Sequence, residues 1–195
     1  MSLSRPLQEI RDDVIRFVER SNTTEVPPYF VYVYDPKDEY PVRRDMADLK
    51  LAFEANDIRC ASISLADLFW EAIDASGDYD AIVGEELARP DDPKALDDIH
   101  QTINEILRDE PSLSQRVRQR MESFPARSVA FLYRAGALYP AYRTSSLLED
   151  LRERLLVPVV LMYPGHVVGG VGLSFMGKCE PAHGYRAKIV QRSGV

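Results

Sequence analysis

The sequence predicts one α/β domain over residues 1–195, built as three layers with a mostly parallel central sheet flanked by helices. Short apolar segments of strand length alternate with longer amphipathic segments of helix length. Two of the short segments, SVAFLY at 128–133 and VPVVLMY at 157–163, are almost continuously apolar. That pattern is typical of parallel strands buried on both faces. The length of 195 residues also fits a single domain.

Capping residues and periodicity place the elements of the first two thirds. Ser4 and Pro6 are typical of a helix start, and an apolar stripe continues to about Arg20. After two prolines, YFVYVY at 29–34 is rich in aromatic and β-branched residues, which favours a strand. The next expected elements are a helix at about 42–56, a strand at 59–64, a helix capped by Ser64 and Asp67, and helices at about 80–89, 94–109 and 112–123.

The last third is expected to complete the sheet. Its elements are a strand at 128–133, a helix at 145–154, a strand at 157–163, and short strands at 173–176 and 185–190. Helices separate the first four strands, so those strands should be parallel, with the last two extending or edging the sheet. The linker ARPDDPK at 88–94 is interpreted as a loop within the domain.

Composition indicates an ordinary globular protein, with 45% apolar and 28% charged residues. No apolar run approaches the roughly 18 residues of a membrane-spanning helix, and the first residues lack the apolar centre of a signal peptide. We therefore expect a cytoplasmic protein that does not contact a membrane. Cys60 and Cys179 are too few for a disulfide framework or a zinc site, so both are expected to be reduced thiols.

Charge is distributed unevenly along the chain. Residues 1–110 carry 12 Lys and Arg against 26 Asp and Glu, a net charge of −14, whereas residues 111–195 carry 12 against 5, a net charge of +7. The two halves either pair with each other or offer faces of opposite charge to different partners. The overall charge of −7 argues against direct DNA binding by this chain alone.

Ligands of parallel α/β sheets bind outside the carboxyl ends of the strands. The residues that this sequence places there are Asp35, Ser64, Asp67, the segment 134–143, and Tyr163 to His166. A P-loop-like topology is compatible with the element order, but the loop after the first strand, YDPKDEYPVRRD, has no glycine and several acidic residues. The glycines of GGVGLSFMG at 169–177 precede a strand rather than a helix, so they are interpreted as a turn. No nucleotide or other cofactor is expected.

The sequence contains no common motif of a hydrolase active site. The chain has neither G-x-S-x-G nor H-E-x-x-H, and His100, His166 and His183 lie far apart in sequence. Asp91, Asp92 and Lys94 lie in a linker broken by prolines, not on the adjoining strands that a nuclease of the D…(D/E)-x-K type uses. No catalytic residue and no metal ligand is predicted.

The segment RSVAFLYRAGALYPAYRTSSLLEDL at 127–151 is instead interpreted as part of a partner-binding surface. Its loop combines arginines and tyrosines, the residue types enriched where protein interfaces concentrate their binding energy. The predicted partner-binding residues are Arg134, Tyr139, Arg143, Tyr163 and His166, with Tyr142 as additional contact area. An equally weighted alternative is that the arginines neutralise the acidic first half and the tyrosines complete the core.

The segments FLYRAGALYPAYRTSSLLEDL, VPVVLMYPG and GLSFMGKCEPAHGYRAKIV resemble the BrxB family of bacterial BREX phage-defence systems. The resemblance is densest from about residue 127 to 190. It implies membership of a multi-protein machine that methylates host DNA and blocks phage, as a core member to which no enzymatic activity is attached. It implies partners within that machine: first the alkaline-phosphatase-like PglZ, then the methyltransferase PglX and the ATPase BrxC.

Three functions are carried forward from the sequence. The leading one is a non-catalytic adaptor that docks a larger BREX enzyme, most directly PglZ. The second is a degenerate nucleotide-binding domain that senses ATP or nucleic acid without hydrolysis. The third and weakest is a nuclease with an unfamiliar site.

Overall fold

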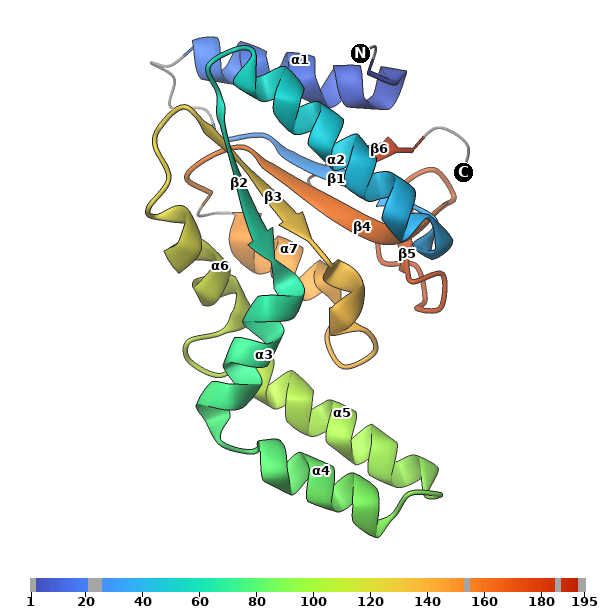
Figure 1. Cartoon of the computed structure of the whole chain (residues 1–195). Coiled ribbons are helices and arrows are strands. Elements are labelled where there is room, and N and C mark those ends of the chain that lie inside the picture. The colour runs from blue at the N-terminus through green and yellow to red at the C-terminus, as the bar shows by residue number, and fades with distance from the viewer. Residues whose placement is uncertain (1–2, 21–25, 153–154, 185–186, 193–195) are drawn as a thin grey trace.

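A six-stranded sheet lies between two layers of helices (Figure 1), which confirms the three-layer α/β fold. The computed structural model describes residues 3–20, 26–152, 155–184 and 187–192. Its strands are β1 (Tyr29–Tyr34), β2 (Arg59–Ser64), β3 (Ser128–Tyr133), β4 (Val159–Val168), β5 (Gly172–Phe175) and β6 (Lys188–Gln191). The strand order is β2-β3-β4-β1-β6, with β5 paired to β4. All pairings are parallel except that of β5, which runs antiparallel to β4.

Helices cover both faces because the central strands β1, β3 and β4 present apolar side chains to both. The helices are α1 (Arg5–Glu19), α2 (Glu39–Glu54), α3 (Leu65–Ser76), α4 (Tyr79–Ala88), α5 (Pro93–Arg108), α6 (Leu113–Met121) and α7 (Thr144–Arg152). Buried residues of α1 and α2 join one core cluster, which includes Phe30 and Phe131 of the sheet. Buried residues of α3, α6 and α7 join the other, which includes Val31 and Leu132. Neighbouring residues of one strand thus face opposite layers, as the two-residue period of a strand requires.

Local sequence signals set the helix boundaries. The Ser64 hydroxyl accepts a hydrogen bond from the Asp67 N–H, and Ser112 and Gln115 form a reciprocal capping box at the start of α6. Gly77 ends α3 in the left-handed region, at φ 78°. Helix α2 begins at Glu39, before the predicted residue 42, because Pro41 lies in the first turn, where a helix needs no N–H donor.

One sequence interpretation at the carboxyl edge is wrong. The segment from Tyr163 to His166 was predicted to be a loop after the fourth strand, but β4 continues through it to Val168. This extension pairs with β5, and a Cβ at Gly165 would collide with the Ser174 carbonyl oxygen. Glycine at 165 therefore permits close pairing with β5. The local sequence Pro164-Gly165 has the composition of a turn, but here it forms part of a strand. Gly169 and Gly170 form the turn that joins β4 to β5, both at positive φ.

The last described segment is joined to α2 beside β1. The Arg192 guanidinium donates to Asp45 at 2.7 Å and to Asp38 at 3.1 Å, and the Tyr32 hydroxyl donates to Asp45 at 2.9 Å. These bonds hold the end of β6 against the start of α2. Tyr185, Arg186 and Arg154, which the sequence had included in regular elements, lie outside the described residues.

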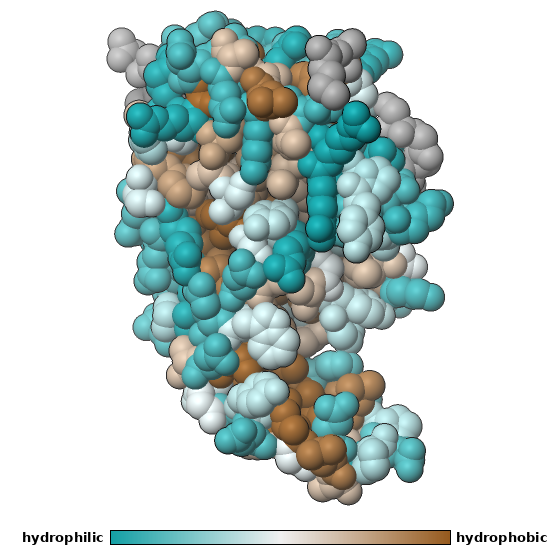
Figure 2. Space-filling view, in the orientation of Figure 1, coloured by the Kyte–Doolittle hydropathy of each residue, from teal (hydrophilic) through white to brown (hydrophobic). Residues whose placement is uncertain are grey.

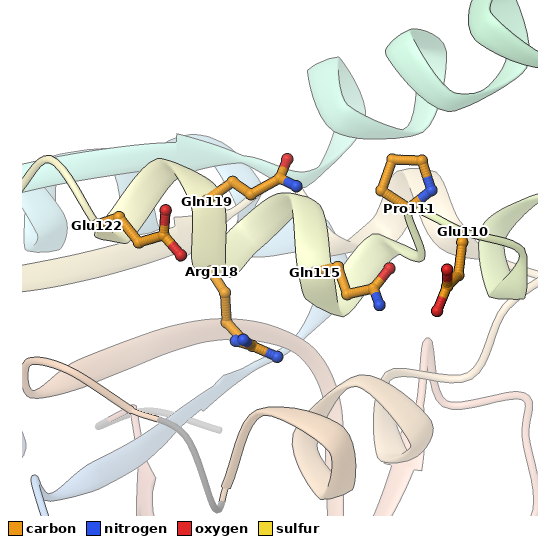
Figure 3. A pocket seen from close by; sticks show the side chains of 6 residues that line it. All are labelled: Glu110, Pro111, Gln115, Arg118, Gln119 and Glu122. Atoms are coloured by element: carbon orange, nitrogen blue, oxygen red, sulfur yellow. The ribbon is translucent and has the colours of Figure 1, made fainter.

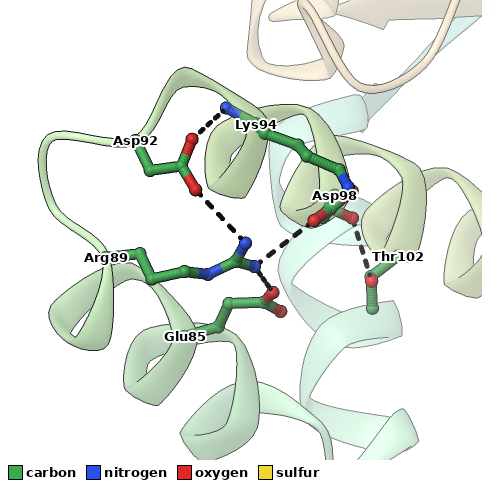
Figure 4. Close-up of polar contacts among 6 residues, drawn as sticks. All are labelled: Glu85, Arg89, Asp92, Lys94, Asp98 and Thr102. Carbon is green, nitrogen blue, oxygen red and sulfur yellow. Dashed lines mark hydrogen bonds and ion pairs between the residues drawn. The ribbon is translucent and has the colours of Figure 1, made fainter.

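The α4–α5 hairpin projects beyond the layers, at the lower end of Figure 1. Helix α5 packs into the molecule through Ile99 and Leu107, whereas α4 has no buried residue. At the turn, Arg89 forms ion pairs with Glu85, Asp92 and Asp98, which belong to α4, the linker and α5 (Figure 4). The Asp92 side chain also accepts from the Lys94 N–H at 2.9 Å and caps α5.

Candidate interaction site at the carboxyl edge of the sheet

The carboxyl ends of the parallel strands surround an open hollow of about 300 Å³. Its lining comes from residues that follow β1, β3 and β5 and from Pro164 within β4; it includes Pro36, Glu39, Arg43, Arg134, Pro164 and Met176. The connections after β1 and β3 lead to helices on opposite faces of the sheet, α2 and α7. This is the place where open α/β sheets bind ligands, so the sequence predicted the position of the edge correctly.

The loop after β1 is closed by its own hydrogen bonds. The Asp35 carboxylate accepts from the Lys37 N–H at 3.0 Å and pairs with the Lys37 ammonium at 3.0 Å. Hydrogen bonding to Lys37 lowers the pKa of Asp35. The Tyr34 hydroxyl donates to Glu39. The loop is therefore a short 3-10 turn, Pro36–Asp38, whose polar groups bond to one another rather than cradling a phosphate.

Arg134 lies on the surface where β3 ends. Its backbone is left-handed, with φ 59°, and its guanidinium donates to Asp67 in the first turn of α3 at 2.9 Å. The two side chains are 47% and 62% exposed. A pair this exposed adds little to stability.

The two tyrosines of the loop have different roles. Tyr142 is buried beneath Arg108 of α5, whose guanidinium carbon lies 5.8 Å from the ring centroid, and burial raises the pKa of Tyr142 to about 12. Tyr139 is 38% exposed and packs edge-on against Phe175, with ring centroids 6.1 Å apart. The core-completing alternative thus describes Tyr142, whereas Tyr139 retains an exposed edge.

Arg143 is one of the exposed residues among those predicted to bind a partner. No hydrogen bond or ion pair joins its side chain to another described residue. The backbone that carries it is held in place, because Asn104 of α5 donates to the Ala141 carbonyl at 2.7 Å. The ordered backbone lowers the entropic cost of binding at this loop, although the Arg143 side chain itself would still lose rotamer freedom.

Tyr163 and His166, the other two predicted partner-binding residues, differ in their exposure to solvent. Tyr163 is fully buried and contacts Phe175, with ring centroids 5.5 Å apart, so in this structure its ring belongs to the core. His166 is half-buried in β4, opposite Ser174 of β5. The surface formed by Arg134, Tyr139 and Arg143 is called the loop surface below.

Other hollows are lined partly by polar side chains. Figure 3 shows one on α6, where Arg118 lies between Glu110 and Glu122 and Gln115 is engaged in the capping box. No group of three or more His, Cys, Asp and Glu side chains within the described ranges is placed to hold a metal ion. Burial raises the pKa of Cys60 to about 12, which keeps this thiol protonated near neutral pH.

The sequence of the chain matches the model of the family described as BREX protein BrxB over residues 61–190. The chain belongs to the BrxB family. Membership connects it with BREX phage defence. No curated protein and no solved structure matches the chain.

The region matched to BrxB begins within β2, ends within β6 and includes every element between them. It therefore contains both the loop surface and the projecting α4–α5 hairpin, while α1, β1 and α2 lie before it. Within the described residues of this BrxB-family chain, no helix is long and apolar enough to cross a membrane.

Sequence reasoning missed one feature of the matched region, the apolar surface of α4. Six of the ten residues in YDAIVGEELA are apolar, yet none of them is buried. Tyr79 and Leu87 are 49% and 74% exposed. The available signal was that apolar residues lie on more than one side of this helix, so that packing one side against the molecule leaves others exposed.

Proposed function

We propose that this chain is a non-catalytic adaptor of a BREX system that docks a larger BREX enzyme, the PglZ-type protein first, through the loop surface. The supporting observation is the contrast within one edge of the sheet. Groups at the strand ends that would contact a small ligand, such as Asp35 and Glu39, bond to neighbouring residues. Arg143 and the edge of Tyr139, in contrast, face outward from an ordered loop.

The loop surface suits a protein partner better than a small molecule. Its side chains project from an open surface, and desolvated arginine and tyrosine anchors often cost about 2 kcal/mol or more when truncated at an interface. The loop is already ordered by the Asn104 bond and by the buried Tyr142, so docking need not order the backbone.

A second candidate function, sensing of a nucleotide without hydrolysis, is favoured by one observation. Arg43 and Arg134 both line the hollow between the ends of β1 and β4, and guanidinium groups bind phosphates. Calorimetric titration with Mg-ATP separates the candidates. If the chain is an adaptor, we expect no binding of Mg-ATP in the low micromolar range. A low micromolar dissociation constant, which corresponds to a binding free energy of about −8 kcal/mol, favours the nucleotide sensor.

The direct test is affinity purification from a host that carries the intact defence system. The wild-type chain should capture the PglZ-type protein. Arg143→Ala should weaken the capture about thirtyfold, which corresponds to about 2 kcal/mol. Arg59→Ala is the matched control, because Arg59 is an exposed arginine at the start of β2, at the opposite edge of the sheet.

Thermal melting establishes that each variant is folded. Capture of no BREX protein by the wild-type chain contradicts the adaptor role. Full capture by folded Arg143→Ala, Arg134→Ala and Tyr139→Ala moves the docking site away from the loop surface.

A further inference from the structure

Apolar residues of α4 form a surface on the projecting hairpin, on which Tyr79 and Leu87 are exposed and Val83 is half-buried. Tyr79, Val83 and Leu87 are spaced four residues apart, which places them along one face of the helix. Leu96, near the start of α5, is 51% exposed and lies beyond the same turn. Figure 2 shows apolar side chains gathered over this projection. We call Tyr79, Val83, Leu87 and Leu96 the hairpin surface.

The hairpin that carries this surface is held by specific contacts. Arg89 connects α4, the turn and α5 through three ion pairs (Figure 4). Helix α5 is in turn anchored by buried Leu107 and by the Asn104 bond to the loop before α7. An ordered apolar surface binds a partner at a lower entropic cost than a segment that must first fold.

Acidic side chains accompany the hairpin surface. Residues 78–98 carry eight Asp and Glu against two Lys and Arg, a net charge of −6. One of the two cations, Arg89, is already paired with three of those carboxylates. An apolar centre with a strongly acidic surround complements a partner whose apolar side chains are surrounded by Lys and Arg.

The same charge argues against the other occupants. Nucleic acid and anionic membrane would be repelled by a surface with a net charge of −6. A symmetric contact with a second copy would set two such surfaces against each other. A head-to-tail contact with the basic half of a second copy would avoid that repulsion, but it generates rings or open filaments rather than a closed pair.

We propose that the hairpin surface is a second docking site, which binds a partner protein through apolar side chains surrounded by Lys and Arg. The site is separate from the loop surface, so one chain can hold two protein surfaces at once. The inference draws on the adaptor role only for the setting of its test, a host with the intact defence system.

Site-specific cross-linking tests the identity of the occupant. The variant Leu87→p-benzoylphenylalanine, irradiated in that host, should form a covalent adduct, and peptide mapping should place it in a segment rich in Lys and Arg that also contains apolar residues. An adduct with a second copy of this chain, an adduct in an acidic segment, or no adduct overturns the inference.

Binding by the same surface can be measured with variants of the full chain and the partner that cross-linking identifies. Leu87→Ser and Tyr79→Ser should each weaken binding about tenfold or more, and Glu86→Lys should slow association, an effect that added salt reduces. Leu51→Ser is the matched control, because Leu51 is a 61% exposed leucine on α2. Equal binding by Leu87→Ser and Leu51→Ser overturns the inference.

The two proposals fail in different ways. If Arg143→Ala loses the PglZ-type protein while Leu87→Ser keeps every partner, the adaptor role stands and the hairpin inference fails. If the hairpin cross-links to a basic protein segment while the wild-type chain captures no BREX enzyme, the adaptor role fails and the hairpin inference stands.

Discussion

The sheet and the α4–α5 hairpin use apolar residues for different purposes. All six residues of β1 are buried, and core residues of the flanking helices contact the strands. Helix α4 is also mostly apolar but buries none of its residues. Burial of apolar area is what stabilises a fold, so the apolar residues of β1 are required for folding. Those of α4 are exposed or half-buried and contribute less to folding, and the hairpin inference gives the exposed ones a role in binding.

The largest expected effect compares two leucines. Leu161→Ala removes a side chain that is fully buried in β4, and should lower the free energy of unfolding by about 3–5 kcal/mol. Leu87→Ala makes the same chemical change at a 74% exposed site and should cost less than about 0.5 kcal/mol. Denaturant unfolding measures both. A cost above about 2 kcal/mol at Leu87 would mean that α4 is part of the core, and would remove the basis of the hairpin inference.

The second largest expected effect is the destabilisation of the sheet at alkaline pH. Burial raises the pKa values of Tyr29, Tyr32 and Tyr34 in β1, and hydrogen bonds to Asp45 and Glu39 add to this for Tyr32 and Tyr34. Above pH 10 these tyrosines lose protons in the unfolded chain first, since their folded-state pKa values are higher. Their stabilisation is therefore complete below about pH 10 and is lost above it, at about 1.4 kcal/mol per pH unit for each tyrosine.

Denaturant unfolding between pH 9 and pH 11 measures this slope. Tyr32→Phe should reduce it by about one tyrosine's share, while Tyr79→Phe, on the exposed α4, is the control and should leave it unchanged. An unchanged slope in Tyr32→Phe would show that Tyr32 ionises normally in the folded protein.

The smallest expected effect lies in the hairpin itself. Arg89→Ala removes three solvent-exposed ion pairs and should change global stability little, because water and salt screen such pairs. Its effect should instead be local, with faster amide hydrogen exchange in α4 and unchanged exchange in β1. Arg16→Ala, which breaks one surface pair with Asp13 on α1, is the control. Uniformly faster exchange across the sheet would contradict the separation of the two regions.

Much of the fold was predictable because short-range signals and burial agree. The strands at 29–34, 59–64 and 128–133 have the predicted boundaries, since apolar and β-branched residues there are bounded by prolines, capping residues or turns. The extension of β4 was not predictable, because Pro164-Gly165 has the local composition of a turn. Pairing with β5, eight or more residues away, decides its conformation.

The loop surface was only partly predictable for a similar reason. The sequence placed the loops after the parallel strands at one edge of the sheet. In the structure, Arg134 lies beside Asp67 at that edge. The sequence does not show which of the two tyrosines is buried, because Tyr139 and Tyr142 lie in the same loop. Their burial depends on their neighbours in the fold, Phe175 for Tyr139 and Arg108 for Tyr142. The exposure of α4 could not be predicted either, because it depends on how far the α4–α5 hairpin projects from the sheet.

The position of β1 has a consequence for biosynthesis. Its two neighbours in the sheet, β4 and β6, begin 130 and 159 residues after it in the chain, at Val159 and Lys188 against Tyr29. During synthesis on the ribosome, YFVYVY therefore emerges long before either neighbour, and its apolar side chains have no sheet to join. Such long-range pairings fold slowly and leave strand edges open to aggregation in the meantime. We therefore expect nascent chains that stop before β4 to depend on chaperones in a way that the finished chain does not.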